Sequence, residues 1–471
     1  MDKKLLVIIV VAILAVAGVG TGIVLMNNGG GGGGNDSRDL NVDLEIYGNA
    51  DKNSKIDEND ALLVERYIDA KSSGDAEAMA EISPKINLTF ADANNDGKID
   101  AADVEQIRAI AAGNATHLWF IDGIGQDRDM DIGSSIKRIG TEYYSNTEAM
   151  LILGQNDKVV AVDNAPYQYL DFYFNDAQKP NITNMVNMND PDYPFINSLD
   201  LDVLLIFSAS ASYEAKQEKL VGTDVLFLGL YNPDLTNTEK SSFIQGILKA
   251  GYIFGAVDRA VDYTNWVIDY RDKMLNIANS IPDKDKPIVG MSNYHNQYFA
   301  NGTSNTMTLY TDIDPLGQAV ILSGGKNILE AINVDKPGYS FKVGIDAVFS
   351  SGVKHFFCHN VKYTYSAMTL ASTPEHGYLV DDYTEFKDAG ATALSQEFMT
   401  DETVTLIAGD FRNGCTGGIL LAAYMGHYIN PDKYADIDPI AMHNEYIGWM
   451  GIEGYDLNEH GVFFYTAEPG A

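Results

Sequence analysis

A long helical pattern at residues 251–280 constrains the fold of this chain more than any other stretch. After Gly255 there is neither Gly nor Pro until Pro282. Between them, apolar side chains recur every three or four residues, at Val257, Ala260, Val261, Val267, Tyr270, Met274, Ile277 and Ala278. This is the period of a helix with one buried stripe. At about 1.5 Å per residue the helix is roughly 38 Å long. It is either a surface helix of one large domain or a rigid strut between two lobes.

Alternating apolar runs and helical segments lie on both sides of this pattern. Apolar runs precede it at 136–139, 158–162, 201–207 and 223–228, and follow it at 286–290, 318–323, 343–349 and 404–408. Such alternation predicts mostly parallel sheets covered by helices. We therefore expect an α/β protein with an N-terminal lobe over 116–255, a connecting helix over 256–281 and a C-terminal lobe over 282–471.

The charge balance excludes one class of partner. The chain has 66 acidic and 32 basic residues, a net charge of −34. This surface repels phosphate backbones, so no nucleic acid partner is expected, whereas cations are attracted. The two cysteines, Cys358 and Cys415, form either one disulfide or two buried thiols.

The N-terminal segment predicts export. Residues 5–26 contain no charge and are long enough to span a bilayer as a helix. Lys3 and Lys4 precede this run, which places the rest of the chain outside the cytoplasm. A cleaved signal peptide is the alternative. Residues 1–35 are thus an anchor or signal segment that ends in a glycine tether at 29–34. An acidic, anchored protein without a lipidation cysteine suits an archaeal cell surface.

Two loops have the spacing of calcium ligands. In the second loop, oxygen ligands fall at the required positions, with Gly97 at the sharp turn: Asp92, Asn94, Asp96, the Lys98 carbonyl, Asp100 and Asp103. A weaker copy upstream offers Asn49, Asp51, Asn53, the Lys55 carbonyl, Asp57 and Asp60. Each loop leads into a helical pattern.

Paired loops with Asp at the twelfth position, each followed by one helix, resemble a dockerin domain over residues 47–113. The resemblance implies a small all-α, EF-hand-like domain over 36–115 with Ca²⁺ as its cofactor. Because dockerins bind cohesin modules, it also implies a cohesin-like protein partner.

Residues 136–470 resemble a substrate-binding protein of an ABC importer, in the class whose two lobes are joined by one long helix. The matching segments, in order, are Ile136-Lys-Arg-Ile-Gly140, Leu199-Asp-Leu-Asp-Val-Leu-Leu-Ile206, Gly255-Ala-Val-Asp-Arg-Ala260 and Gly324-Gly-Lys-Asn327. Members of this class carry ferric siderophores, haem or cobalamin. The resemblance implies an ABC permease as partner, with Asp346 at the position of the acidic docking residue of the second lobe.

Ligand-binding residues are expected in loops that follow the carboxyl ends of strands. Tyrosines there offer flat surfaces with a hydroxyl for a planar or macrocyclic ligand. Arg412 is suited to a carboxylate or an anionic chelate shell, and His295 and His359 are either iron or cobalt ligands or structural residues. The candidate residues are Tyr144, Ser145, Asn146, Tyr167, Tyr213, Tyr231, Tyr294, His295, Tyr298, His359 and Arg412.

Together with the N-terminal segment, the resemblance implies extracytoplasmic capture of a small-molecule iron or cobalt chelate rather than catalysis. The chain has no Gly-x-Ser-x-Gly elbow, His-Glu-x-x-His motif or P-loop. Two alternatives stay open. One is a dockerin-bearing surface hydrolase, which would need two carboxylates facing across a groove. The other is a cell-surface assembly protein that has lost transport.

Overall fold

The computed structural model describes residues 40, 42–208, 212–237, 241–293, 306–332, 338–360 and 404–466. Residues 38–471 form one compact unit. The apolar run at residues 5–26 lies outside the described residues. Within the described ranges, no helix is both long and apolar enough to cross a membrane. The membrane anchor therefore stays a prediction.

A small helical module opens the described chain. Its helices are α1 (Glu58–Ser73), α2 (Ala76–Ile82), α3 (Leu88–Ala91) and α4 (Ala101–Ala111). The two calcium-loop patterns lead directly into α1 and α4. Asp57 caps α1 with Asp60 at the third helical position, and Asp100 and Asp103 repeat this at α4. Both pairs form capping boxes, in which each carboxylate accepts a backbone N–H of the helix start. The last acidic positions of each loop thus also begin the next helix.

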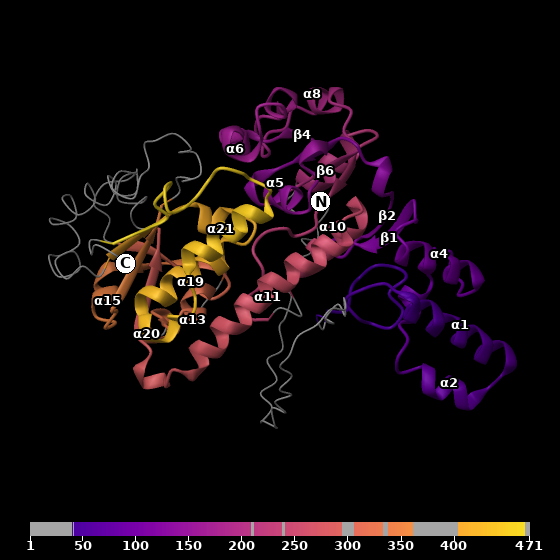
Figure 1. Cartoon of the computed structure of the whole chain (residues 1–471), viewed down its shortest axis with the longest axis horizontal. Helices are drawn as coiled ribbons and strands as arrows, with labels where there is room; N and C mark the ends of the chain where they lie inside the picture. Colours follow the sequence, from indigo (N-terminus) through magenta and orange to yellow (C-terminus); the bar gives the residue numbers. More distant parts are fainter. Residues whose placement is uncertain are drawn as a thin grey trace, which may run out of the picture. The chain divides into compact units, whose positions relative to one another are not determined.

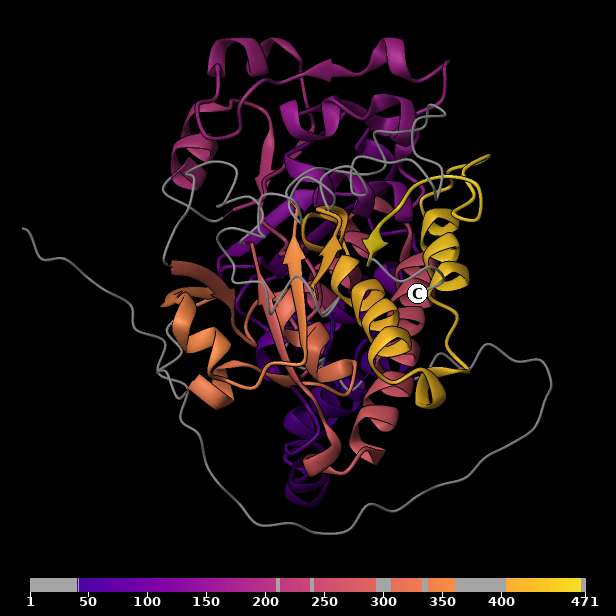
Figure 2. The same cartoon turned by 90° about the vertical axis from the view of Figure 1, so that its left-hand side faces the viewer.

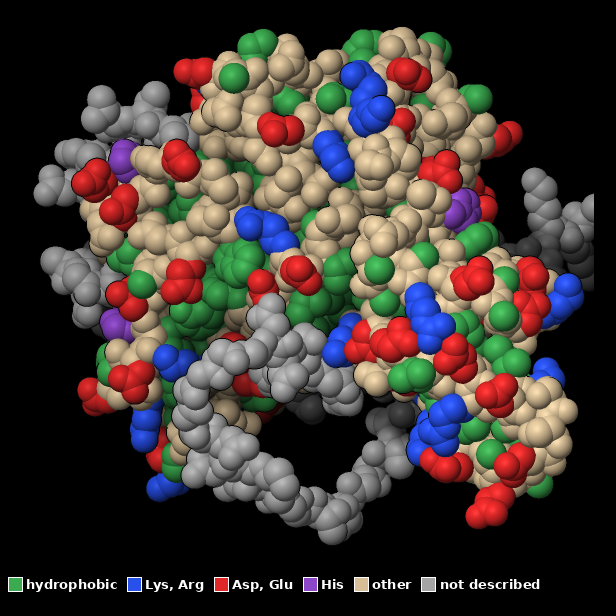
Figure 3. Space-filling view, turned by 45° about the vertical axis from the view of Figure 1, so that its right-hand side comes forward, with side chains coloured by type: hydrophobic (Ala, Val, Ile, Leu, Met, Phe, Trp, Pro, Cys, Tyr) green, Lys and Arg blue, Asp and Glu red, His purple; other side chains and the backbone are tan. Residues whose placement is uncertain are grey.

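The module surface carries charges of both signs. Arg108 on α4 contacts Glu58 and Glu65 on α1, and Arg66 contacts Glu81. Acidic side chains are spread over the face seen in Figure 3, with lysines and arginines among them. Exposed pairs of this kind contribute little to stability.

A first sheet follows the module. The hairpin of β1 (His117–Ile121) and β2 (Asp127–Asp131) comes first. Five strands then pair in the order β5-β4-β3-β6-β7, all parallel. They are β3 (Ile139–Thr141), β4 (Val159–Val162), β5 (Thr183–Asn184), β6 (Val203–Leu205) and β7 (Asp224–Leu226). Strands β3 and β6 are buried along their whole length, as expected of a parallel sheet covered on both faces.

Short helices connect these strands. They are α5 (Tyr143–Ile152), α6 (Asn164–Tyr167), α7 (Leu170–Tyr173), α8 (Tyr193–Ser198) and α9 (Ser212–Lys219), with 3-10 turns at Gly133–Ser135, Asn156–Lys158 and Lys179–Asn181. On this sheet, strand–helix alternation was predicted correctly. The strands are shorter than the apolar runs that indicated them. The runs at 201–207 and 223–228 continue into the loops after β6 and β7, whereas the run at 136–139 lies mostly before β3, which begins only at Ile139.

Helices α10 (Ser242–Phe254) and α11 (Val257–Ser280) leave the first sheet. Gly255 ends α10 in the left-handed conformation, with φ of 72°, which glycine adopts without steric cost. Helix α11 packs against α10 near its start and against α13, α19 and α20 further along (Figure 1). Its fully buried residues are Ala260, Tyr263, Thr264, Val267, Ile268, Met274 and Ala278. The observed buried stripe is therefore centred on Ala260, Val267 and Met274. Four other residues of the predicted stripe are only partly buried: Val257, Val261, Tyr270 and Ile277.

A second sheet lies beyond α11, after a 3-10 turn at Asp283–Asp285. Its strands run in the order β11-β9-β8-β12-β13-β14, and β10 also pairs with β8. They are β8 (Ile288–Ser292), β9 (Thr306–Tyr310), β10 (Lys326–Asn327), β11 (Ser340–Gly344), β12 (His355–His359), β13 (Val404–Ile407) and β14 (Phe464–Tyr465). The centre is parallel, whereas β9, β11 and β14 pair antiparallel with their neighbours.

The helices of this part are α13 (Pro315–Leu322), α14 (Leu329–Ile332), α15 (Ile345–Phe349), α18 (Asp410–Asn413), α19 (Gly417–Ile429), α20 (Pro431–Tyr434) and α21 (Pro439–Trp449). Helices α19 and α21 pack on each other, and α19 lies beside α11 (Figure 2). Cys358 on β12 and Cys415 before α19 are both buried and are not joined in a disulfide. The structure thus has the two buried thiols and not the disulfide.

The helical module is bound to the large body by several kinds of contact. Ile46 forms an antiparallel bridge with Phe120 of β1. Lys249 of α10 forms an ion pair of 2.7 Å with Glu45. Buried apolar residues of the module belong to the same hydrophobic core as those of the body. The module is therefore packed on the body and not merely tethered to it.

Two helical glycines give a matched test of how closely the helices pack within the large body. A Cβ on Gly246 of α10 would lie 2.1 Å from the Leu228 carbonyl oxygen, whereas one on Gly448 of α21 meets nothing within 4 Å. We expect Gly246→Ala to lower the free energy of unfolding by about 1–3 kcal/mol or more. Gly448→Ala should raise it by up to about 1 kcal/mol, because alanine favours helix. Urea unfolding measures both, and equal effects would contradict this packing.

Candidate functional site

Arg412 is the centre of a polar and aromatic cluster between the two sheets. Its Nε and Nη2 donate to Oδ2 of Asp314 over 3.2 and 3.1 Å. The Asp314 carboxylate is fully buried and caps α13, while 31% of the Arg412 side chain is exposed. The guanidinium also lies 5.3 Å from the centre of the Tyr310 ring. Burial raises the pKa of Asp314, and the Arg412 charge offsets part of that rise.

Three aromatic residues of the first lobe, Tyr143, Phe207 and Tyr231, complete the cluster. Tyr143, at the start of α5, stacks on Phe207 with ring centres 3.9 Å apart, and Tyr231 meets Phe207 edge-on at 5.3 Å. The Tyr143 hydroxyl donates to Oδ1 of Asn413 over 2.8 Å. Asn413 belongs to α18, so this bond joins the two lobes next to Arg412. Arg412 and Asn413 of α18 thus lie next to aromatic side chains of the other lobe.

The backbone of Tyr143 is strained. Its φ is 67°, in the left-handed region that bulky side chains rarely adopt. Such strain concentrates at functional sites, where the surrounding structure holds it in place. Burial raises the pKa of Tyr143 to about 12, with Arg412 acting in the opposite direction. Burial likewise raises the pKa of Tyr310 to about 12. These hydroxyls are therefore neutral donors and acceptors at physiological pH.

Asn232 fixes the loop that carries Arg412. Its Nδ2 donates to the carbonyls of Arg412 and Gly414, and its Oδ1 accepts the N–H of Gly418 over 2.9 Å. Its backbone N–H also donates to the Cys415 carbonyl. With φ of 41°, Asn232 adopts a conformation that asparagine tolerates better than most residues. One side chain of the first lobe thereby holds the chain on both sides of α19's start.

Glu148 forms a second link between the lobes. It lies on α5 and is fully buried. Its carboxylate accepts hydrogen bonds from the hydroxyls of Tyr173 and Tyr446 and from the backbone N–H of Cys415. Tyr446 lies on α21. Three donors from separate parts of the chain therefore converge on one buried carboxylate.

The predicted binding residues near α5 divide into surface and interior positions. Tyr144 is half-buried beside Tyr169, with ring centres 5.7 Å apart. Ser145 and Asn146 are buried, and Asn146 donates to the carbonyls of Glu142 and Leu205. The Asn146 side chain thus holds α5 against β6, whereas the buried Ser145 hydroxyl has no hydrogen-bond partner among the described residues.

Tyr167 and Tyr213 lie apart from each other. Tyr167 is half-buried at the end of α6. Tyr213 on α9 is buried, and its hydroxyl lies within hydrogen-bonding distance of Asp122 and Arg128. The environment of Tyr213 is thus that of a packing residue beneath the β1–β2 hairpin.

His359 ends β12 in the protein interior. Its Nδ1 lies 3.4 Å from the Tyr310 hydroxyl. Burial first, and then the Arg412 charge, lower its pKa to about 3, so the imidazole is neutral. Tyr294, His295 and Tyr298 lie outside the described residues. Asp346, the predicted permease-docking residue, is exposed in the first turn of α15.

The second calcium loop is wound around Asp92. Both carboxylate oxygens of Asp92 accept backbone N–H groups, from Asp96 over 3.0 Å and from Gly97 over 2.8 Å. Gly97 has φ of 87°, as the sharp turn requires. Asp103 at the twelfth position is buried and accepts N–H groups from Asn94 and Asp100. Burial raises the pKa of Asp103.

The first loop shows more directly that it suits a cation. Asn49 is fully buried; its Nδ2 donates to the carbonyls of Leu44 and Asn53, while its Oδ1 has no hydrogen-bond partner. Burial, and then the nearby Asp51 carboxylate, raise the pKa of buried Asp60 to about 7. An orphaned oxygen and a buried carboxylate at loop positions one and twelve fit an oxygen-seeking ion.

The other candidate ligand side chains of the first loop are paired within the loop. Asp51 Oδ2 accepts from the Asn53 side chain, and the Lys55 ammonium lies 2.9 Å from Asp57. Across the described ranges, no three carboxylate, imidazole or thiolate groups converge as a metal cluster. Calcium loops add amide and carbonyl oxygens to their carboxylates, and both loops carry these. The ligand types present therefore fit Ca²⁺.

Several members of the Arg412 cluster were not predicted from the sequence. Tyr143 immediately precedes a predicted residue, but its strained backbone leaves no sequence signal. Asp314, followed by Pro315, has the pattern of a helix cap, and that signal does not reveal a second role. Phe207 belongs to the first lobe and Tyr310 and Asn413 to the second, so only the packing of one lobe on the other brings them into one cluster.

The comparisons with known proteins agree with this architecture. Residues 47–109 match the dockerin type I domain. The structure is similar to the TroA-like periplasmic binding protein FepB from Veillonella parvula, with a TM-score of 0.55 and 14% sequence identity over 74% of this chain and 99% of that one. It is also similar to the molybdate periplasmic binding protein MolA of Haemophilus influenzae, with a TM-score of 0.51 and 13% identity over 72% and 99%. No curated protein matches the sequence.

The large body has the two-lobed fold of ABC-transporter solute-binding proteins. Identities this low show the fold alone. The predicted combination of such a fold with a dockerin-like module is confirmed. Dockerins and solute-binding proteins act outside the cytoplasm. The ligand, the permease and the residues that bind them stay predictions.

Removing the charge of Glu148 tests the link between lobes. Because the amide of Glu148→Gln presents a donor where the carboxylate accepts three hydrogen bonds, we expect a loss of about 1.5–3 kcal/mol in the free energy of unfolding. Glu445→Gln is the matched control. Glu445 accepts from Trp266 and Tyr270 at an exposed position, so its loss should stay within about 0.5 kcal/mol. Denaturant titration of both variants measures these losses. An unchanged free energy of unfolding in Glu148→Gln would refute the link.

Calcium should stabilise the helical module. We expect a higher melting temperature and higher helicity with Ca²⁺ than with a chelator, because the ion neutralises the loop carboxylates. Asp92→Ala should remove most of the gain, whereas Asp69→Ala, an exposed change on α1, should keep it. Circular dichroism with and without chelator measures both. Identical melts in the two conditions would show that the loops do not bind calcium.

Proposed function

We propose that this protein is an extracytoplasmic solute-binding protein that delivers a metal chelate to an ABC permease. The observation that carries the proposal is the Arg412 cluster, in which groups from both lobes meet at one partly exposed guanidinium. A two-lobed binding protein uses such a position to hold its ligand. The lobes would be residues 116–255 and 282–471, joined by the helix at 256–281.

The charges of the cluster favour a large chelate over a small oxyanion. The charge of Arg412 is already balanced by buried Asp314. Among the described residues of the cluster, no unbalanced positive charge is left to bind a small dianion such as the molybdate of MolA. Tyr143, Tyr231 and Phe207 instead provide stacking surfaces and hydroxyls. These suit an iron-siderophore, haem or cobalamin-type ligand.

The other parts of the chain fit the same role. The module at residues 36–115 would bind Ca²⁺ and attach the protein to a cohesin-like partner. The exposed carboxylate of Asp346 would meet the permease. The segment at residues 5–26 would anchor the protein to the membrane. The competing hypothesis is a dockerin-bearing surface hydrolase.

Ligand binding to the purified chain tests the proposal. Ferric hydroxamate, haemin and cyanocobalamin are titrated while tryptophan fluorescence is followed, and we expect one of them to bind at micromolar concentration. Arg412→Lys keeps the charge beside Asp314 but loses the planar fork, so it should weaken binding roughly 10- to 100-fold. Arg66→Lys, at an exposed position on α1, is the control and should bind normally.

Two results would contradict the proposal. Failure of all three probes to bind, together with release of sugars from a polysaccharide, would favour the hydrolase. Equal affinities of wild type and Arg412→Lys would move the ligand site away from this cluster.

A further inference from the structure

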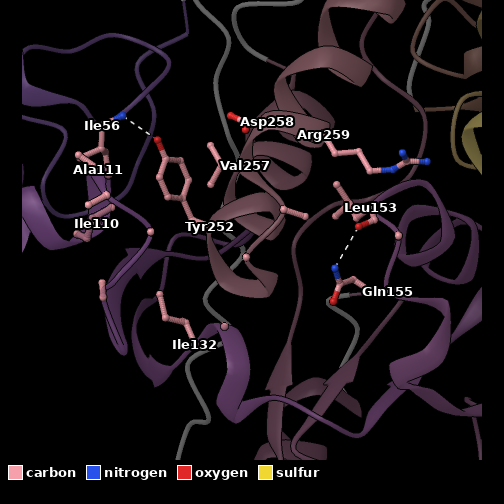
Figure 4. Close-up of a pocket in the computed structure, with 17 residues that line it drawn as sticks. Ile56, Ile110, Ala111, Ile132, Leu153, Gln155, Tyr252, Val257, Asp258 and Arg259 are labelled. Atoms are coloured by element: carbon pink, nitrogen blue, oxygen red, sulfur yellow. Dashed lines mark hydrogen bonds between the residues drawn. The ribbon is translucent and has the colours of Figure 1, made fainter.

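The contact between the module and the body is interrupted by a pocket. The pocket has a volume of about 660 Å³ and lies between the ends of α4 and α5 and the corner of α10 and α11. Its apolar walls include Ile110, Ile132, Leu153 and Val257 (Figure 4). Direct contacts between the module and the body lie beside this space, since Ile56 and Tyr252 both line it.

One of these contacts reaches the first calcium loop. The backbone N–H of Ile56 donates to the hydroxyl oxygen of Tyr252 over 2.8 Å, as the dashed line in Figure 4 shows. Both residues are buried. Tyr252 lies in the last turn of α10, just before Gly255 and the start of α11. The hydrogen bond therefore runs from the loop to the corner where the connecting helix begins.

The bonded N–H belongs to a peptide unit with a second role. The carbonyl of that unit is the carbonyl of Lys55, at loop position seven, where calcium loops supply a backbone oxygen. In a trans peptide the C=O and N–H point in opposite directions. Tyr252 thus holds the side of the peptide away from the metal. A hydrogen bond to the N–H also polarises the peptide and makes its oxygen a better ligand.

We propose that Tyr252 is a positioning residue for calcium in the first loop. It links occupancy of that loop to the α10–α11 corner of the large body. The inference rests on the proposed binding of calcium by this loop. Because coupling between sites is reciprocal, calcium should also strengthen the docking of the module on the body.

The second loop provides an internal control. The corresponding peptide is Lys98–Ile99, and Lys98 is exposed. The N–H of this peptide is that of Ile99, the counterpart of the Ile56 N–H in the first loop. Among the hydrogen bonds of the described residues, none joins this peptide to the large body. Loss of the Tyr252 hydroxyl should therefore affect only one of the two loops.

Calcium titration calorimetry on the full chain separates the loops. Asp92→Ala leaves the first loop as the intact site, and Asp51→Ala leaves the second. Adding Tyr252→Phe should weaken calcium binding about three- to tenfold in the Asp92→Ala background and leave it unchanged in the Asp51→Ala background. Tyr270→Phe, which removes the hydroxyl on α11 that donates to Glu445 of α21, should change neither. A thermal melt of each variant in chelator confirms folding.

The outcomes distinguish the coupling from the site itself. If Asp92→Ala binds no calcium, the first loop is not a calcium site, and the role of Tyr252 falls with it. If it binds and Tyr252→Phe leaves the affinity unchanged, only the coupling is overturned. Equal weakening in both backgrounds would also overturn it, because that result indicates general destabilisation. In a second readout, calcium should slow hydrogen exchange of the Ile56 amide in wild type more than in Tyr252→Phe.

Discussion

The buried carboxylate of Glu148 is the interaction on which the arrangement of the lobes depends. A charge without water is costly unless several donors satisfy it. Here the donors are Tyr173, Tyr446 and the N–H of Cys415, which belong to segments far apart in sequence. Because each donor is needed to offset burial of the charge, the segments are held in one relative placement. That placement brings the start of α5 against the loop that carries Arg412.

The Arg412 cluster follows from this constraint. Asn232 secures the backbone on both sides of Cys415, and Tyr143 reaches across to Asn413. The left-handed backbone of Tyr143 is unfavourable in isolation, so neighbouring contacts must maintain it. The protein's own contacts thus order these side chains, which is the preorganisation that the proposed ligand site requires. The single long helix α11 agrees with small relative movements of the lobes rather than wide closure.

Sequence periodicity predicted the elements better than the site. The calcium-loop spacing led correctly to the starts of α1 and α4, because ligand positions nine and twelve are also the capping residues. The stripe of α11 was predicted with a rotational offset, since Tyr263 and Ile268 are buried while Val257 and Ile277 are not. Tyr213 illustrates the limit for the site. A loop tyrosine has the same sequence signature whether its hydroxyl faces a ligand or, as here, Asp122 and Arg128.

The sequence by itself determined those features that depend on residues close together in the chain. It specified two oxygen-rich turns that start helices, one long amphipathic helix, and α/β alternation on both sides of it, because caps, turns and apolar periods act over a few residues. Only the tertiary structure decided which polar groups share a space. The pairs Arg412–Asp314, Tyr143–Asn413 and Ile56–Tyr252 join residues about 100 to 270 positions apart. Their proximity arises from burying one common core, and no local pattern encodes it.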